Sequence, residues 1–185
     1  MLREKSRIRG RLTVVVFGPD GQIKRRNPSF WQRLTGRPGS PMVAINHNIV
    51  TNDGDAMVAD LCAQTPALTK LANASGFIAV GTGWTGSTPK ANTWVNTISG
   101  SPEALDATYP VLKGTFGNAD DNVTIYRATF EAGDLNVTGI DEAVLSNANT
   151  DGGGQALAYA QITPEINVTS ADTLQVTWEI TFLGA

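Results

Sequence analysis

The stretch that most constrains the fold lies near the carboxyl end of the chain, at residues 173–182, and reads TLQVTWEITF. Apolar and polar side chains alternate along it, and neither Gly nor Pro interrupts it. A strand places the five apolar residues on one face, whereas a helix would scatter them around its circumference. These residues are Leu174, Val176, Trp178, Ile180 and Phe182. A strand with one apolar face needs similar partners, so we expect it to be central in an antiparallel sheet.

Other segments have the composition of strands. They are residues 7–17, 42–50, 77–80, 123–130, 135–145 and 156–162. The run GPDG at 18–21 supplies turn chemistry for a hairpin that returns through Ile23. Residues 81–122 are rich in Gly, Thr, Ser and Asn, so we expect only short strands there. The prediction is a mainly β fold, an antiparallel β-sandwich of the jelly-roll or Greek-key kind with one short helix.

The helix of the body is expected to begin with Asn52 or Asp53 as its N-cap and to end near Ala63. One face of this helix would carry Met57, Val58, Leu61 and Cys62. Residues 67–71 are expected to add a further helical turn. Cys62 is the only cysteine, so it forms no internal disulfide, and its place on the apolar face predicts a small core residue.

Charge is distributed unevenly along the chain. Residues 1–37 hold ten of the fourteen Lys and Arg residues but two of the seventeen acidic ones. We therefore expect a basic amino-terminal arm at 1–41, ending in a Gly/Pro-rich linker, and an acidic body at 42–185. Either the arm's charges only keep an exposed hairpin soluble, or the arm docks on an acidic neighbour, such as a second copy of the chain.

The arm also contains apolar residues spaced for one amphipathic helical turn, which would anchor it to a partner. The predicted partner-binding residues of the arm are Arg3, Arg7, Arg9, Arg11, Lys24, Arg25, Arg26, Phe30, Trp31 and Leu34.

Residues that could carry chemistry are few. With one histidine, His47, and one cysteine, a zinc cluster of His and Cys ligands is excluded. His47 lies on a predicted strand, where a packing or edge role is expected. The acidic pairs 53/55, 120/121 and 141/142 suggest acid–base or calcium chemistry, but the first pair suits a helix start and the second lacks EF-hand spacing. We predict no enzymatic activity, no metal and no cofactor.

Aromatic residues stand out in the loop-rich stretch. Trp84, Trp94 and Tyr109 would either bury at a subunit interface or stack on sugar rings. The chain has no apolar run long enough for a membrane span or a signal peptide, so no membrane partner is expected.

Four motifs together resemble a group of small structural proteins of tailed-bacteriophage virions. They are NIVTNDG at 48–54, FIAVGTG at 77–83, ATFEAG at 128–133 and the TLQVTWEITF strand, and the resemblance covers residues 46–182. The motifs are signatures of a fold and carry no catalytic group. The resemblance implies a β-sandwich virion component and leaves open whether it decorates the head or belongs to the neck or the tail attachment.

The function expected from these observations is a non-enzymatic structural component of a virion, made in the host cytoplasm. Its expected partners are other virion proteins of the capsid, neck or tail, and further copies of itself, with a trimer as one candidate state. Direct nucleic-acid binding is not expected. The alternative is a carbohydrate-binding receptor module of a phage tail, with the loops between Trp84 and Tyr109 as its ligand surface.

Overall fold

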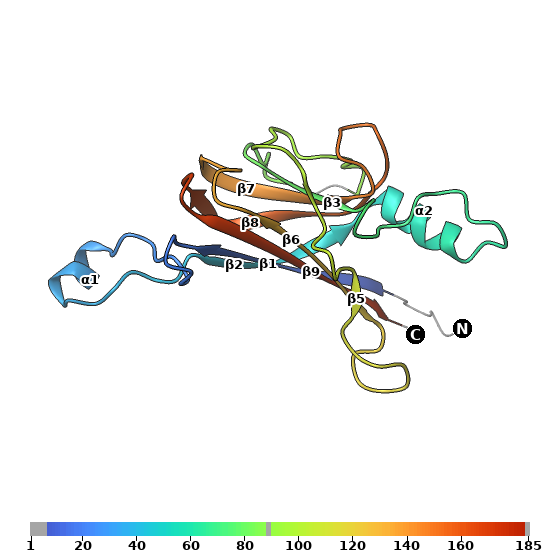
Figure 1. Ribbon diagram of the computed structural model, residues 1–185, viewed down its shortest axis with the longest axis horizontal. Coiled ribbons are helices and arrows are strands. Elements are labelled where there is room, and N and C mark those ends of the chain that lie inside the picture. Colours follow the sequence, from blue (N-terminus) through green and yellow to red (C-terminus); the bar gives the residue numbers. More distant parts are fainter. Residues whose placement is uncertain (1–6, 88–89, 184–185) are drawn as a thin grey trace.

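A computed structural model of the protein describes residues 7–87 and 90–183. Strands hold 42% of the described residues and helices 9%, so the prediction of a mainly β fold is confirmed. Nine strands form one curled antiparallel sheet with the order β4-β3-β7-β8-β2-β1-β9-β6-β5 (Figure 1). The strands are β1 (Arg7–Phe17), β2 (Val43–Val50), β3 (Phe77–Gly81), β4 (Glu103–Ala104), β5 (Val111–Leu112), β6 (Val123–Phe130), β7 (Val137–Ser146), β8 (Ala156–Val168) and β9 (Thr173–Leu183). The helices are α1 (Phe30–Leu34) and α2 (Asn52–Leu61).

The predicted central strand is confirmed. β9 lies between β1 and β6 and pairs antiparallel with both. Four of its five apolar side chains are fully buried and the fifth, Phe182, is half-buried against the core. The period-2 pattern therefore identified both the strand and its buried face.

The sheet curls so that β3, β7 and β8 lie over β1, β9 and β6 (Figure 1). β2 carries the sheet around the bend, because it pairs with β1 over residues 43–48 and with β8 through Ile49 and Val50. One large core cluster fills the space between the two halves and includes Val14, Ile140 and Ile162. Burial of this apolar surface is the main stabilising contribution to the fold.

β1 corrects the expected division between arm and body. Its side chains Leu12, Val14 and Val16 are fully buried, and the strand lies between β2 and β9. Residues 7–17 are therefore part of the body, because a sheet interior needs a strand at that position to complete its hydrogen bonds. The segment that projects is residues 18–41, which we call the arm (Figure 1). Residues 1–6 lie outside the described residues.

α2 begins one residue earlier than expected. Its N-cap is Thr51, whose hydroxyl accepts a hydrogen bond of 3.0 Å from the amide of Gly54. Gly54 lets α2 approach β8, since a Cβ at this position would lie 2.2 Å from the carbonyl oxygen of Leu157. The helix is thereby held close against the sheet.

Two expectations about the end of α2 are wrong. Cys62 is exposed and is not a core residue, because the helix buries Gly54 and Met57 and its last turn extends beyond the sheet. Residues 67–71 form no helical turn; instead the carboxylate of Asp60 accepts hydrogen bonds from the amides of Ala67 and Leu68 and holds them in an irregular loop. The Pro at position 66 removes the amide that a continuing helix would need.

Candidate interaction surface on the arm

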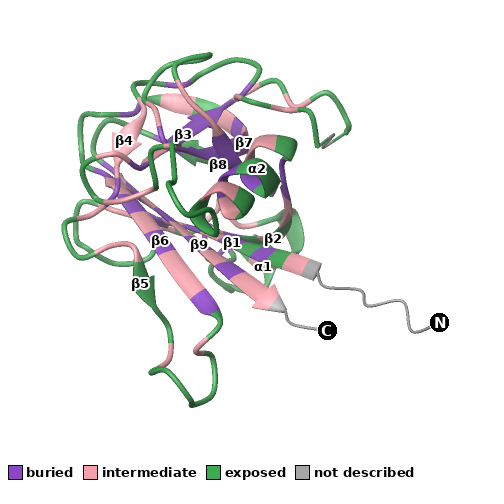
Figure 2. Cartoon of the chain, turned by 90° about the vertical axis from the view of Figure 1, so that its right-hand side faces the viewer, coloured by how far each residue is buried: buried purple, intermediate pink, exposed green. Residues whose placement is uncertain are grey.

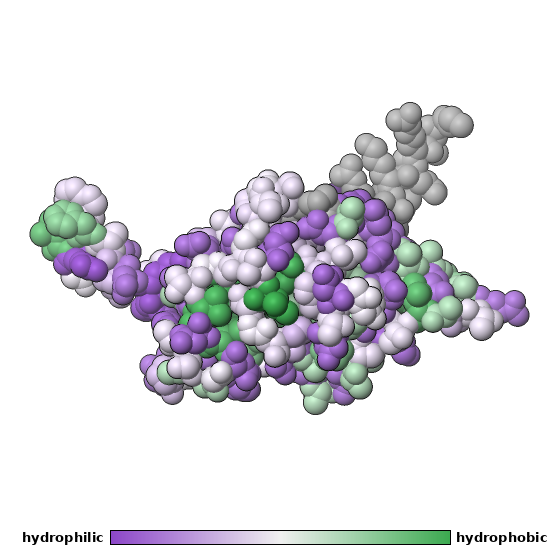
Figure 3. Space-filling model, turned by 90° about the horizontal axis from the view of Figure 1, so that it is seen from above, coloured by the Kyte–Doolittle hydropathy of each residue, from purple (hydrophilic) through white to green (hydrophobic). Residues whose placement is uncertain are grey.

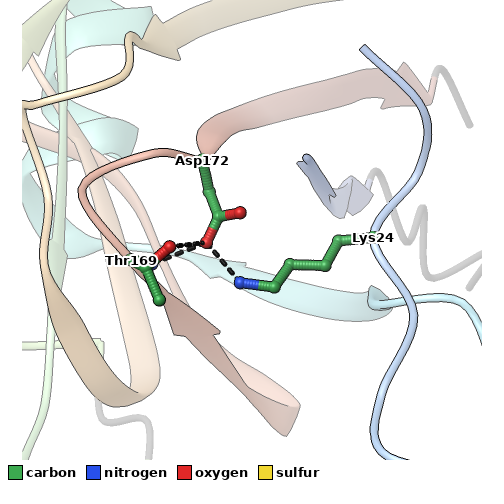
Figure 4. A network of polar contacts seen from close by, with 3 residues as sticks. All are labelled: Lys24, Thr169 and Asp172. Atoms are coloured by element: carbon green, nitrogen blue, oxygen red, sulfur yellow. Dashed lines mark hydrogen bonds and ion pairs between the residues drawn. The ribbon is translucent and has the colours of Figure 1, made fainter. Parts of the chain in front are cut away.

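The root of the arm is tied to the body by an ion pair. The ammonium of Lys24 donates to the carboxylate of Asp172, which lies in the turn between β8 and β9 (Figure 4). The same carboxylate accepts from the amide of Thr169 at 2.7 Å and from its hydroxyl at 2.6 Å. Burial would raise the pKa of Asp172, but the hydrogen bonds from Lys24 and Thr169 outweigh it and lower that pKa below its ordinary value.

The stem of the arm consists of two strand-like segments that run side by side. The amide of Arg26 donates to the carbonyl of Ser40 at 2.8 Å, and Arg25 forms a β-bridge with Pro41. The guanidinium of Arg25 also donates to the carbonyl of Gly39 at 3.0 Å. These contacts close the stem, and the segment beyond it projects as a loop.

The tip of the arm, residues 27–38, is built around α1. Ser29 and Gln32 form a reciprocal capping box, in which each side chain accepts from the backbone amide of the other residue. At the other end, Gly36 has a φ of 66°, and the amide of Arg37 donates to the carbonyl of Gln32 at 2.8 Å. Both ends of the single turn are therefore capped, although it buries none of its own residues.

The apolar side chains of α1 face solvent. The exposed fractions are 73% for Phe30, 71% for Trp31 and 68% for Leu34. The two aromatic rings meet edge to face, with centroids 5.6 Å apart and planes at 75°. Figure 3 shows this tip standing clear of the body, with hydrophobic and hydrophilic residues next to one another. The three residues thus form an apolar patch that nothing in the described chain covers.

The structure separates the basic residues that were expected to act together. Arg7, Arg9 and Arg11 lie on β1 in the body, Lys24 is held by Asp172, and Arg3 lies outside the described residues. Arg26 donates to the carbonyl of Pro164 on β8 at 3.3 Å. Of the expected basic residues, only Arg25 and Arg26 remain near the tip.

Two further arginines, Arg33 and Arg37, belong to the tip and are exposed. They were missed as partner-binding residues even though Arg33 lies within the amphipathic turn, between Trp31 and Leu34. That position was the available signal, because Arg33 directly precedes the apolar Leu34 within the same helical turn. We define the candidate interaction surface as the apolar patch of α1 together with three arginines of the arm. Its residues are Phe30, Trp31, Leu34, Arg25, Arg33 and Arg37.

The three aromatic residues of the loop-rich stretch do not form one surface. Trp84 and Trp94 are half-buried and pack against a second apolar cluster that contains Val144 and Tyr159. Tyr109 instead packs against the main core, with the guanidinium carbon of Arg127 4.4 Å from its ring centroid. A sugar-binding face that uses all three aromatic rings is therefore not assembled in this fold.

The acidic pair 141/142 anchors the loop that carries these tryptophans. Asp141 accepts from the amides of Gly83 and Trp84 at 3.0 and 3.2 Å. Glu142 is fully buried and accepts from the amide and side chain of Asn96, at 2.7 and 2.8 Å, and from the hydroxyl of Tyr159. Burial first, and then this carboxylate, raise the pKa of Tyr159 above its ordinary value. Hydrogen bonds within the protein thus occupy both carboxylates.

The remaining chemistry-bearing residues are dispersed. In the part of the chain that the structure describes, no three or more His, Cys, Asp or Glu side chains are placed to hold a metal ion. His47 is exposed on β2, opposite Arg11 of β1. An open pocket of about 490 Å³ with polar and apolar lining lies beside α2, and its polar residues include Arg9, Asn48 and Lys90 but no His, Cys, Ser or Thr.

Neither helix in the described residues is long and apolar enough to cross a membrane. No family model, curated protein or solved structure matches the chain.

Proposed function

We propose that the protein is a non-enzymatic structural component of a tailed-phage virion, which attaches to neighbouring virion proteins through its arm. The body would be a β-sandwich of the jelly-roll or Greek-key kind, with the arm as an attachment device. The proposal draws on the resemblance of residues 46–182 to small virion proteins and on the composition of the arm. Head decoration and neck or tail attachment are both compatible with it.

The observation that carries the proposal is the exposure of Phe30, Trp31 and Leu34 on a fully capped helical turn. Exposure of large apolar side chains at one place is characteristic of interaction sites. Aromatic residues and arginines also dominate the binding energy of protein interfaces, and the tip presents both kinds. A partner with an apolar recess and acidic surroundings would complement this surface.

The internal hydrogen bonds of the arm favour the same interpretation. The capping box of α1 and the stem contacts of Arg25 and Arg26 fix the shape of the tip before any partner binds. Ordering a flexible loop would cost about 0.5–1.5 kcal/mol for each immobilised side chain, and a preformed tip avoids much of this cost. A segment that only improved solubility would need no such order.

Incorporation into particles tests the proposal. Particles assembled with the Trp31→Ser variant should contain at least about tenfold less of the protein than particles assembled with the unchanged chain, since an aromatic anchor is lost. The matched control is Phe116→Ser, because Phe116 is 91% exposed and lies in the loop between β5 and β6. Circular dichroism and melting temperature should be the same for both variants.

Equal incorporation of Trp31→Ser and Phe116→Ser would overturn the attachment role of the arm. Absence of the unchanged protein from purified particles would overturn the virion assignment itself. Raising the salt concentration from about 0.15 M to about 1 M should weaken attachment without abolishing it, because salt screens the arginines but not the apolar contact.

A further inference from the structure

We propose that the tip of the arm docks into an apolar pocket at the opposite end of a second copy of this chain, so that copies join head to tail. This inference rests on the proposed function and names the partner of the same surface. Its basis is a match in size, chemistry, charge and position between the tip and that pocket.

The pocket lies between α2 and the nearby ends of β6, β8 and β9. Its lining residues are Met57, Val58, Leu61, Lys70, Leu71, Tyr126, Leu157 and Phe182. Leu61 at the rim is 52% exposed, whereas Met57 and Leu157 at the base are 3% exposed. The pocket is therefore a recess with an apolar floor that opens to the surface at this end of the molecule, which faces the viewer in Figure 2.

The size of the recess fits one aromatic ring. Its volume is about 150 Å³, and an apolar cavity of about this volume in another protein accommodates benzene. The tip offers two rings, Phe30 and Trp31, with Leu34 beside them. Insertion of one ring would leave the other, and Leu34, to cover the exposed side chain of Leu61 at the rim.

The tip and the pocket lie too far apart in one molecule to touch, so the contact between them joins two molecules. Figure 1 places α1 at one end of the longest axis of the molecule and α2 at the other, with the whole sheet between them. The short stem, closed by Arg26 and Ser40, cannot return the tip to its own pocket. Contact between two different surfaces is heterologous, and repeated heterologous contacts produce a closed ring or an open filament.

Charge favours the same pairing. The tip and stem carry Arg25, Arg26, Arg33 and Arg37 without an acidic residue between positions 25 and 41. α2, which forms one wall of the pocket, carries Asp53, Asp55 and Asp60 and no basic residue. Lys70 at the pocket and Lys90, paired with Asp55, offset part of this negative charge. The arginines would steer the tip toward α2, and the apolar contact would hold it there.

Disulfide trapping provides the direct test, because the natural Cys62 is exposed and directly follows Leu61 of the pocket rim. We expect the Thr35→Cys variant of the full chain, under mild oxidation, to give a series of cross-linked multimers on a non-reducing gel. Thr35 is the exposed C-cap residue of α1, next to Leu34. Adding Cys62→Ser to this variant should abolish the series.

The same pair of variants excludes other contacts. If tips dock against tips, Thr35→Cys together with Cys62→Ser would still form disulfide-linked dimers, and this result would overturn the inference. Absence of any multimer from the Thr35→Cys chain, at a concentration where the unchanged chain self-associates, would overturn it as well.

A pocket variant separates this inference from the proposed function. Leu61→Arg and Trp31→Ser should each weaken self-association, measured by sedimentation velocity, at least about tenfold. The matched control is Leu112→Arg, because Leu112 is 58% exposed on β5 and does not line the pocket. If Leu61→Arg enters particles and self-associates normally while Trp31→Ser does not enter them, the tip binds a different virion protein. The head-to-tail contact would then be rejected and the attachment role would stand.

Discussion

Leu12 of β1 lies directly opposite Trp178 of β9, and Tyr126 of β6 lies opposite the same tryptophan on its other side. Leu12 and Trp178 are fully buried, and Tyr126 is 8% exposed. A single row of side chains thus connects the amino-terminal strand to the carboxyl-terminal one across the sheet. Strands β1 and β9, which are far apart in the sequence, therefore belong to one structural unit.

Trp178 should be the most costly single truncation in this row. Replacement of a buried Trp by Ala removes its packing and leaves a cavity, at a cost of about 3–5 kcal/mol. We expect Trp178→Ala to lower the free energy of unfolding by this amount in urea titrations. Trp178→Phe, which retains one aromatic ring, should lose less. Unchanged stability of the Ala variant would show that the inner face of β9 is not core.

Removal of β1 should prevent folding. A chain that starts at Met42 lacks Leu12, Val14 and Val16, each of which contributes about 1.5–3 kcal/mol by burial. Their sum is a large share of the total stability of about 5–15 kcal/mol typical of a domain. The truncated chain should therefore lack a cooperative thermal transition.

Excision of the tip provides the contrasting variant. Because Arg26 and Ser40 are hydrogen-bonded neighbours, residues 27–39 can be replaced by Asn-Gly, which suits a two-residue hairpin turn. This shortened chain should melt cooperatively, within a few degrees of the unchanged protein. Folding of the Met42 chain, or misfolding of the shortened one, would contradict the assignment of residues 7–17 to the body.

Local patterns in the sequence predicted most of the strands. The alternation in 173–182, the valines of 7–17 and the β-rich run 123–130 each identified a strand within one residue of its observed bounds. The sequence did not reveal which strands pair, because pairing depends on contacts between distant residues. The arginines of β1 therefore led to the prediction of an arm. In the folded sheet, the outward-facing residues of this strand are simply those that contact solvent.

The candidate site could be predicted only in part, because part of it also depends on contacts between residues that are distant in the sequence. The spacing of Phe30, Trp31 and Leu34 predicted a helical turn, and the structure contains it. The ion pair of Lys24 was not predictable, because Asp172 lies 148 residues away in sequence. The apolar pocket could not be predicted from the sequence either, since its lining residues Val58, Tyr126 and Phe182 come from three separate elements.

The ion pair at the root of the arm should make stability depend on pH. The pKa of Asp172 is lower in the folded protein than in the unfolded chain, where it is about 3.9. The stabilising contribution is therefore complete above that unfolded value and disappears as pH falls through the folded one. Asp172→Asn should cost about 1–3 kcal/mol near pH 7, because a buried charged hydrogen bond is lost.

The difference between Asp172→Asn and the unchanged protein should narrow at about pH 3, because this pH lies below the pKa of about 3.9 in the unfolded chain, whose carboxyl group is then mostly protonated. A matched control is Asp151→Asn, because Asp151 is exposed in the turn before β8. Urea titrations of the three proteins at pH 7 and pH 3 measure six free energies of unfolding. A difference that is constant with pH would mean that the charge of Asp172 does not contribute to stability.

Glu142 should hold residues 90–99 of the loop that follows β3 against the sheet. Its carboxylate accepts from the amides of Asn96 and Thr97, the side chain of Asn96 and the hydroxyl of Tyr159. Glu142→Ala would leave these donors without their acceptor, at a cost of about 1–3 kcal/mol for each donor that stays buried. The loop should then detach locally before the whole protein unfolds.

Limited proteolysis can measure this detachment, because Lys90 provides a trypsin site within the loop. Cleavage after Lys90 should be at least about tenfold faster in Glu142→Ala, since a shift of about 1.4 kcal/mol in the opening equilibrium changes the open population tenfold. Glu165→Ala is the control, because Glu165 is exposed on the neighbouring strand β8. Equal cleavage rates in the two variants would mean that the packing of Trp84 and Trp94 holds the loop without help from the buried carboxylate.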